Sequence, residues 1–144
     1  MNSRLWGLSH YFYECVGGTL GRLTEILYNV LNSNSISTRA SIGKNTIFYH
    51  HGLGCVIHRD CVIGDNCKIF GNVTIGCKWS NGINDGKVPR IGNNVMIGAG
   101  AVILGDIYIG DNSLIGANST VLSDVPQNSI ATGNPMRIKF RYES

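Results

Sequence analysis

Residues 91–121 read IGNNVMIGAGAVILGDIYIGDNSLIGANSTV, and every sixth position of this stretch is aliphatic. The apolar period extends back along the chain, and its members are Ile36, Ile42, Phe48, Ile57, Ile63, Ile69, Ile75, Ile91, Ile97, Ile103, Ile109, Ile115 and Val121. Helices repeat near 3.6 residues and strands near 2, so neither element produces this period. A hexapeptide period is typical of a parallel β-helix, where each unit forms one short strand and a turn. We therefore predict an all-β fold, a triangular prism with these side chains stacked inside.

Two further positions of the repeat support this prediction. The fifth position is small in most units, including Cys61, Cys67 and Ala101, as a second inward-facing slot in a narrow prism requires. The second position is often glycine, which allows another backbone or a ligand to approach closely. The five cysteines include no pair at the short spacing that zinc sites use. We therefore predict that Cys61 and Cys67 fill the core, and we predict no metal site.

Length and composition favour a single compact domain. The chain has 144 residues, of which 43% are hydrophobic and 15% charged, values typical of a folded globular protein. The net charge of +3 suits ligands that carry phosphate but does not indicate nucleic acid, and none is predicted. The scattered thiols and the lack of a signal peptide favour a cytoplasmic location. Because a short prism exposes much surface for its volume, we expect it to associate with copies of itself.

The repeat divides the chain into three parts. Residues 1–35 are predicted to form an N-terminal helical cap, residues 36–125 the prism, and residues 126–144 a C-terminal tail. Apolar residues at helical spacing predict one amphipathic helix over residues 18–32, and an aromatic stretch over residues 6–13 precedes it. We expect the helix to cover the open end of the prism, with docking on a membrane surface as the alternative.

The repeat fails at two places, and we expect the functional site there. Phe48 and Ile57 lie nine residues apart instead of six. Ile75 and Ile91 lie sixteen apart, which predicts an exposed, inserted loop over residues 77–90. In solenoid proteins such insertions gather on one face and commonly build the binding site.

His50 and His51 adjoin the first break and are followed by glycines that leave room for a substrate. A neutral imidazole near pH 7 is well suited to remove a proton from a hydroxyl group, so this pair supplies the candidate general base. Neighbouring residues of a strand face opposite ways, so at most one of the two serves a given cleft. His58 lies one position past an inward-facing residue, where it either lines the same cleft or has only a structural role.

Several stretches resemble one known family. They are the hexapeptide repeats themselves, HHGLGCVIH (residues 50–58), NVTIG (residues 72–76), IGAGAVILGDIYIGDNSLIGANSTVLSDVP (residues 97–126) and ATGNPMRI (residues 131–138). Together they look like the serine acetyltransferase-like branch of the hexapeptide acyltransferases. The resemblance implies a left-handed parallel β-helix, a homotrimer, and acetyl-CoA as co-substrate in a cleft between neighbouring prisms.

The resemblance also implies roles for individual residues. A histidine base activates the acceptor hydroxyl, and glycine-rich turns contact the coenzyme arm and its thioester at Gly76, Gly98, Ala99, Gly116 and Ala117. Arg137 and Lys139 lie just past the prism, where they either hold the coenzyme phosphates or belong to a solvated tail.

The resemblance leaves open which histidine is the base. Counting forward from Ile42 puts His50 at the catalytic position, whereas counting back from Ile63 puts His51 there. The two counts differ because the chain has one extra residue between these anchors. Relatives that modify polysaccharides carry a histidine two residues before Gly-Leu-Gly, which favours His50.

Other positions depart from true serine acetyltransferases. The aspartate that orients their histidine is matched by Ser35. The Arg-His pair of their loop, which helps to hold the carboxylate of the amino acid, is matched by Lys87 and Val88. Asp85 and Lys87 in the loop are then candidates to bind the acceptor. These departures favour a sugar hydroxyl over an amino acid as the acceptor.

Three functions follow from the sequence. The first is an acetyl-CoA-dependent O-acetyltransferase that acts on a sugar or polysaccharide precursor. The second is serine O-acetyltransferase, which feeds cysteine synthesis, and the third is a non-catalytic β-helix scaffold. The intact glycines and the histidines at the break weigh against the scaffold.

Overall fold

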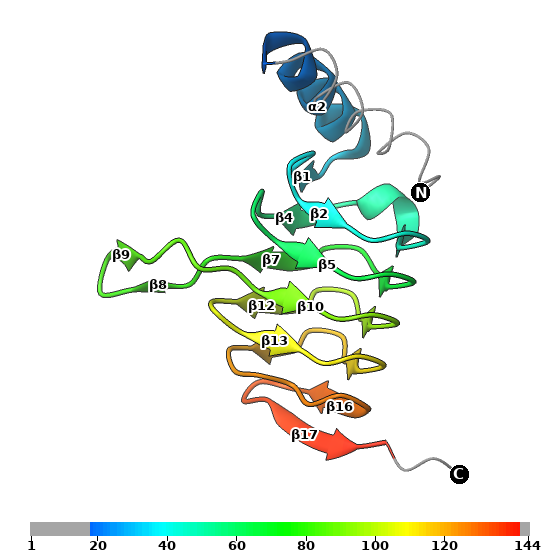
Figure 1. Cartoon of the computed structure of the whole chain (residues 1–144), viewed down its shortest axis with the longest axis vertical. Coiled ribbons are helices and arrows are strands. Elements are labelled where there is room, and N and C mark those ends of the chain that lie inside the picture. Colours follow the sequence, from blue (N-terminus) through cyan, green and yellow to red (C-terminus); the bar gives the residue numbers. More distant parts are fainter. Residues whose placement is uncertain (1–17, 142–144) are drawn as a thin grey trace.

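The computed structural model describes residues 18–141, in which one α-helix, α2 (Gly18–Asn32), stands above a column of short strands (Figure 1). Successive strands of the column belong in turn to three sheets. The first sheet contains β1 (Ser35–Ile36), β4 (Val56–Ile57), β7 (Thr74–Gly76), β12 (Val102–Leu104) and β15 (Thr120–Val121). The second contains β2 (Ser41–Ile42), β5 (Val62–Ile63), β10 (Arg90–Ile91) and β13 (Tyr108–Ile109). The third contains β3 (Ile47–Phe48), β6 (Lys68–Ile69), β11 (Met96–Ile97), β14 (Leu114–Ile115), β16 (Ser129–Thr132) and β17 (Arg137–Phe140).

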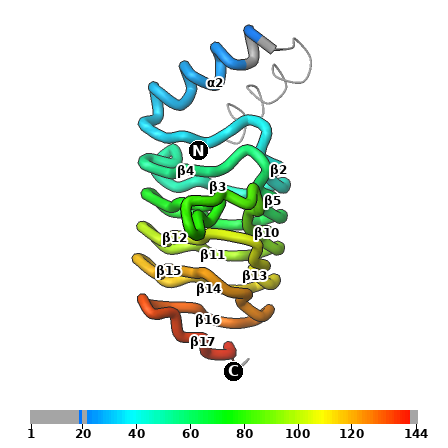
Figure 2. Tube along the Cα trace, turned by 90° about the vertical axis from the view of Figure 1, so that its left-hand side faces the viewer, coloured from blue at the N-terminus to red at the C-terminus, as the bar shows by residue number. Residues whose placement is uncertain are grey.

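Equivalent residues of neighbouring coils lie directly above one another. Ile75 of β7 pairs in parallel register with Ile57 of β4 on one side and with Ile103 of β12 on the other. The last strand, β17, instead runs antiparallel to β16. Figure 2 shows the same column from the side, with α2 at one end and β17 at the other. The predicted fold of parallel strands is therefore confirmed, and its closure into a left-handed prism stays a prediction.

The hexapeptide positions form the core. All of the predicted inward-facing residues are buried except Ile42, which is half-buried and packs against the core. The small fifth positions are buried as well, from Ala40 at one end to Ser119 at the other. The six-residue period is thus the spacing at which the chain returns a side chain to the interior.

Two glycines show why the second position of the unit is often glycine. A Cβ on Gly64 would lie 2.6 Å from the carbonyl oxygen of Gly92, and one on Gly98 would lie 2.5 Å from the backbone nitrogen of Ala117. Neighbouring coils therefore approach too closely for a side chain. For Gly98 the stacking of coils accounts for the residue without any ligand.

Helix α2 meets the first coil through polar contacts. The Thr38 hydroxyl donates a hydrogen bond to Glu25 at 2.6 Å, and the backbone N–H of Ile36 donates to the side chain of Asn29 at 3.3 Å. The apolar residues of the predicted stripe that the structure describes, Leu23, Ile26, Leu27, Val30 and Leu31, are all exposed. The helix is confirmed, but its apolar side does not cover the coil as expected. Polar side chains face the coil instead, because the first coil presents backbone and hydroxyl groups that need hydrogen-bond partners.

The other N-terminal expectations concern the membrane and the aromatic stretch. The aromatic stretch over residues 6–13 lies outside the described residues. Within residues 18–141 no helix has the length and hydropathy to span a bilayer.

The inserted segment leaves the column as a hairpin. Its strands β8 (Trp79–Ser80) and β9 (Ile83–Asn84) pair antiparallel and project sideways from the stack (Figure 1). Lys87 Nζ donates a hydrogen bond to Asp106 Oδ2 at 2.9 Å, which joins the end of the loop to the next coil. This contact raises the pKa of Lys87 and lowers the pKa of Asp106.

Cys55, Cys61 and Cys67 are buried free thiols, so the prediction that Cys61 and Cys67 fill the core is confirmed. Burial raises the pKa of Cys61 to about 12 and also raises the pKa values of Cys55 and Cys67. Because the thiolate is the reactive form, we expect iodoacetamide at pH 8 to leave these three unmodified in the native protein. Peptide mass mapping before and after denaturation checks this result. Native labelling of Cys61 as fast as that of the half-buried Cys77 would contradict it.

Candidate functional site

Two edges of the column carry the candidate residues. The turns that lead from the third sheet to the first form one edge of the column, which we call the histidine edge. It consists of residues 49–55, 70–73, 98–101 and 116–119. The turns that lead from the first sheet to the second form another edge, which we call the loop edge. It consists of residues 37–40, 58–61, 77–89 and 105–107. The two edges border opposite sides of the first sheet.

His50 and His51 lie at the head of the histidine edge, in the 3-10 turn η1 (Tyr49–Gly52). Both have left-handed backbone angles, with φ of 52° and 58°, and both side chains are exposed. This conformation costs about 1–3 kcal/mol at a residue other than glycine. Nine further described residues, eight of them asparagines, adopt it singly at other turns, whereas here two histidines adopt it in succession. The residues that the repeat has in excess here therefore form a strained turn that presents two imidazoles to solvent.

Neighbouring side chains hold this turn in place. The ring of Tyr49 stacks on that of Phe70, with centroids 4.6 Å apart and planes 9° from parallel. Asn34 Nδ2 donates a hydrogen bond to the backbone carbonyl of His51 at 2.9 Å. The other polar atom of that side chain, Asn34 Oδ1, is buried and has no hydrogen-bond partner among the described residues. The Tyr28 side chain of α2 also interacts with Asn34, so Asn34 joins the helix to the histidine turn and carries a buried oxygen without a hydrogen-bond partner there.

The turns below the histidines stack along the same edge. Backbone hydrogen bonds of 2.8–3.0 Å join successive turns, from Asn72 to Leu53, from Gly100 to Gly71 and from Asn118 to Ala99. At 4.7–4.9 Å per coil, the three steps from the histidine turn to Ala117 span roughly 14 Å. Ala99 and Ala117 are exposed, and within residues 18–141 their N–H groups donate to no protein acceptor. The structure thus brings Gly98, Ala99, Gly116 and Ala117 onto the edge that carries the histidines.

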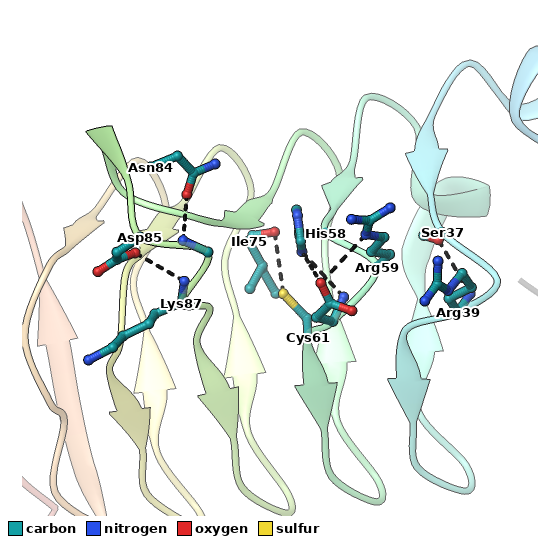
Figure 3. Close-up of polar contacts among 11 residues, drawn as sticks. Ser37, Arg39, His58, Arg59, Cys61, Ile75, Asn84, Asp85 and Lys87 are labelled. Atoms are coloured by element: carbon teal, nitrogen blue, oxygen red, sulfur yellow. Dashed lines mark hydrogen bonds and ion pairs between the residues drawn. The ribbon is translucent and has the colours of Figure 1, made fainter. Parts of the chain in front are cut away.

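A groove of about 510 Å³ lies on the other side of the first sheet, at the loop edge. Its lining includes His58, Arg59, Trp79 and Asn84. Among the described residues that line it, Arg59 is the single arginine or lysine, and none is an aspartate or glutamate. Figure 3 shows His58 and Arg59 on the turn after β4, between the first coil and the loop that carries Asn84.

His58 is held as a hydrogen-bond donor. Its Nδ1 accepts a hydrogen bond from the backbone N–H of Asp60 at 3.3 Å and lies 3.6 Å from the carboxylate of the same residue (Figure 3). A neutral imidazole that accepts at Nδ1 carries its proton on Nε2, and an imidazolium carries protons on both nitrogens. With Nδ1 accepting from the Asp60 N–H, the ring carries a proton on Nε2 and His58 can donate from this atom.

The remaining predicted residues lie elsewhere. Gly76 ends β7 and lines the groove at the loop edge, on the opposite side of the first sheet from the histidine turn. Asp85 accepts a hydrogen bond from the backbone N–H of Lys87 at 3.0 Å, and neither residue lines the groove. Arg137 and Lys139 are exposed on β17, at the end of the column away from the histidines (Figure 1). Within residues 18–141 no three histidine, cysteine or acidic side chains converge on a point that could hold a metal ion.

Three residues of these sites were missed from the sequence. Arg59 and Trp79 line the groove, and Asn34 contacts the histidine turn. None occupies a repeating position, so the hexapeptide period gave no signal for them. The turn position directly after His58 was the one available pointer to Arg59.

Residues 89–123 match the family model described as bacterial transferase hexapeptide (six repeats). A serine acetyltransferase of Synechococcus elongatus is 39% identical over 135 residues, which cover 93% of this chain and 54% of that protein. A probable serine acetyltransferase of Oryza sativa subsp. japonica is 46% identical over 103 residues, which cover 72% of this chain and 33% of that protein. The chain thus spans between one third and three fifths of the length of these and similar curated relatives.

Solved structures give the same result for the fold. Soybean serine acetyltransferase complexed with serine superposes with a TM-score of 0.85 at 34% identity, covering 95% of this chain and 55% of that one. Serine acetyltransferase of Brucella abortus strain S19 in complex with coenzyme A gives a TM-score of 0.86 at 30% identity, covering 97% and 55%.

These similarities correct the predicted acceptor. The prediction of a sugar or polysaccharide acceptor is wrong, because the relatives and the solved structures are named serine acetyltransferases. The departures on which it rested, at Ser35, Lys87 and Val88, are single side chains. The similarity extends over more than nine-tenths of the chain, so the alternative drawn from the sequence, serine acetyl transfer, fits better.

Proposed function

We propose that this chain transfers the acetyl group of acetyl-CoA to the hydroxyl of L-serine, as a hexapeptide-repeat O-acetyltransferase. The observation that carries the proposal is the strained turn that presents two exposed imidazoles at the head of the histidine edge. The identity of the two substrates is supported by the relatives named serine acetyltransferase, of which one was solved with serine and another with coenzyme A.

The reaction asks three things of the protein. A thioester supplies an activated acetyl group, so the chain has to orient the hydroxyl, remove its proton and stabilise an oxyanion. The imidazole takes the hydroxyl proton while the serine oxygen bonds to the carbonyl carbon. It returns this proton to the thiolate that leaves when the carbon–sulfur bond breaks, so no further reactant is needed. Exposed backbone N–H groups of the histidine edge are the donors available for the oxyanion.

We infer that His51 is the base. The count forward from Ile42 still gives His50, but the second argument for His50, from polysaccharide-modifying relatives, loses its support with the corrected acceptor. Asn34 binds the backbone of His51 and has a buried oxygen, Oδ1, without a partner. A ring N–H of His51 that reaches this oxygen would fix the tautomer and leave the other nitrogen free to accept a proton. This assignment is also the one obtained by counting back from Ile63.

The coenzyme arm is proposed to lie along the histidine edge. Ala99 and Ala117 are exposed residues whose N–H groups donate to no acceptor among the described residues, and these groups would pair with the amide groups of the arm. Arg137 is paired in register with Thr132, just past the lower end of this edge. Its guanidinium, with the ammonium of Lys139, is then placed to meet the coenzyme phosphates.

The complete site is proposed to form between copies of the chain, in a homotrimer of left-handed prisms. His51 and His58 lie at opposite ends of β4, in turns that belong to different edges of the first sheet. Within one chain, the base and the groove are therefore separated. The histidine edge of one copy placed against the loop edge of the next would bring them together, and a ring closes such head-to-tail contacts.

Transfer itself tests the proposal. Purified protein is incubated with acetyl-CoA and L-serine, release of the coenzyme thiol is followed, and O-acetylserine is identified by mass spectrometry. We expect thiol release that depends on serine and exceeds hydrolysis measured without an acceptor. Absence of serine-dependent release, together with no binding of coenzyme A, would contradict the proposal and favour the non-catalytic scaffold.

A further inference from the structure

We infer that Arg59 and His58 bind the carboxylate of the acceptor in the groove at the loop edge. The inference rests on the proposed function and names the residues that select an amino acid over an alcohol without a carboxylate. It assigns to Arg59, in the turn after β4, a role that neither the repeat nor the inserted loop predicted.

The charge of the groove favours an anionic group. Arg59 is the single arginine or lysine in the described lining, and no acidic side chain accompanies it there. Its Nε lies 3.6 Å from Asp60 Oδ2, whereas its two Nη atoms have no hydrogen bond or ion pair within residues 18–141. Asp60 does not line the groove and contacts the guanidinium at Nε, so it can orient the group while both Nη atoms stay free to donate to a ligand. A free pair of guanidinium N–H groups matches the two oxygens of a carboxylate.

His58 adds a second donor beside the first. Its side chain is 32% exposed and lines the same groove. Asp60 occupies the Nδ1 side of the ring, so Nε2 keeps its proton and can donate to the same carboxylate. One residue, Asp60, thus contacts both donors and fixes their relative position.

Other cations near the loop edge are less suited to this role. The ammonium of Lys87 is bonded to Asp106 at 2.9 Å and lies outside the lining. Arg39, one coil above Arg59, is exposed but does not line the groove (Figure 3). The rest of the groove is neutral, and the hydroxyls of Ser35 and Thr74 are acceptors that suit the ammonium group of an amino acid.

The substitution Arg59→Gln tests the inference. We expect it to raise KM for L-serine about 10- to 100-fold while kcat and KM for acetyl-CoA change little, because it removes a charge-assisted contact to the acceptor alone. Arg59→Lys keeps the charge but not the paired N–H groups, so an intermediate KM is expected. Wild-type protein should prefer L-serine to L-serinamide, which lacks the carboxylate, and Arg59→Gln should lose most of this preference. Arg39→Gln is the matched control and should behave as wild type.

The outcomes separate this inference from the proposed function. Turnover of L-serine with an unchanged KM in Arg59→Gln would overturn the inference and leave the function standing. A raised KM for acetyl-CoA with no change for L-serine would also overturn it, since Arg59 would then hold the coenzyme phosphates. Binding is followed independently through the fluorescence of Trp79, which lines the groove, in a Trp6→Phe background. Quenching by L-serine that Arg59→Gln weakens would support the inference even if no acetyl transfer occurs, whereas quenching equal in both proteins would contradict it.

Discussion

Replacing His51 with alanine is expected to lower kcat for acetyl transfer to L-serine by roughly 10²- to 10⁴-fold, the usual contribution of a general base. The expected loss is in kcat rather than in KM for either substrate, because the proton is removed only as the reaction proceeds. The side chain is exposed, so the thermal midpoint of unfolding should stay close to that of the wild type. The measurement is thiol release at saturating concentrations of both substrates.

His50→Ala is the matched control. His50 lies in the same turn, has the same left-handed backbone and is also exposed, so any general effect of altering the turn should appear in both variants. We expect its kcat to remain close to the wild-type value. The opposite order of the two effects would show that His50 is the base and that the count forward from Ile42 is the correct one.

Replacing Ile103 with alanine is expected to lower the free energy of unfolding by about 2–5 kcal/mol, the range found when a large buried aliphatic side chain is truncated. Ile103 is fully buried and is stacked between Ile75 and Val121 in parallel register. A cavity there interrupts the core in the middle of the column. Urea denaturation followed by circular dichroism measures the change. Val62→Ala is the control, because this strand residue is 43% exposed, and an equal loss in both variants would contradict the assigned interior.

The repeat explains why so much of the fold could be predicted. Each unit places its aliphatic residue in the same environment, so a period in the chain translates directly into a stacked column such as Ile75, Ile103 and Val121. The failures of the period likewise located the histidine turn and the inserted loop. Both signals are local, because they depend only on the spacing between neighbouring units.

The features that could not be predicted from the sequence depend on contacts between distant segments of the chain. The apolar stripe of helix α2 was visible in the sequence, but the side of the helix that faces the first coil was not. The polar contact between Glu25 and Thr38 shows that the polar side faces the coil. The groove combines side chains from turns that are not neighbours in the chain, such as Arg59 and Trp79. No spacing rule brings these residues together, so they could be found only in the folded chain.

The error in the acceptor has a related cause. A missing pair in the loop, at Lys87 and Val88, was interpreted as the loss of carboxylate binding. That interpretation assumed that the carboxylate is always bound by residues at the same position of the chain. In a stacked fold, a binding side chain can come from another turn of the same edge, and Arg59 lies in such a turn and lines the groove.

The central claim, that base and groove come from different copies, is tested most directly by complementation. One variant, His51→Ala, lacks the base, and the other, Gly76→Phe, fills the groove. At Gly76 an added Cβ would meet nothing closer than His58 Cβ at 3.8 Å, so a side chain can start there without a clash with the backbone of the stack. Each variant alone should be nearly inactive. After co-expression, about one quarter of the seams in a random mixture should combine an intact base with an intact groove. The account predicts that this mixture regains activity, whereas a mixture no more active than its parts, in assemblies shown to contain both variants, would contradict it.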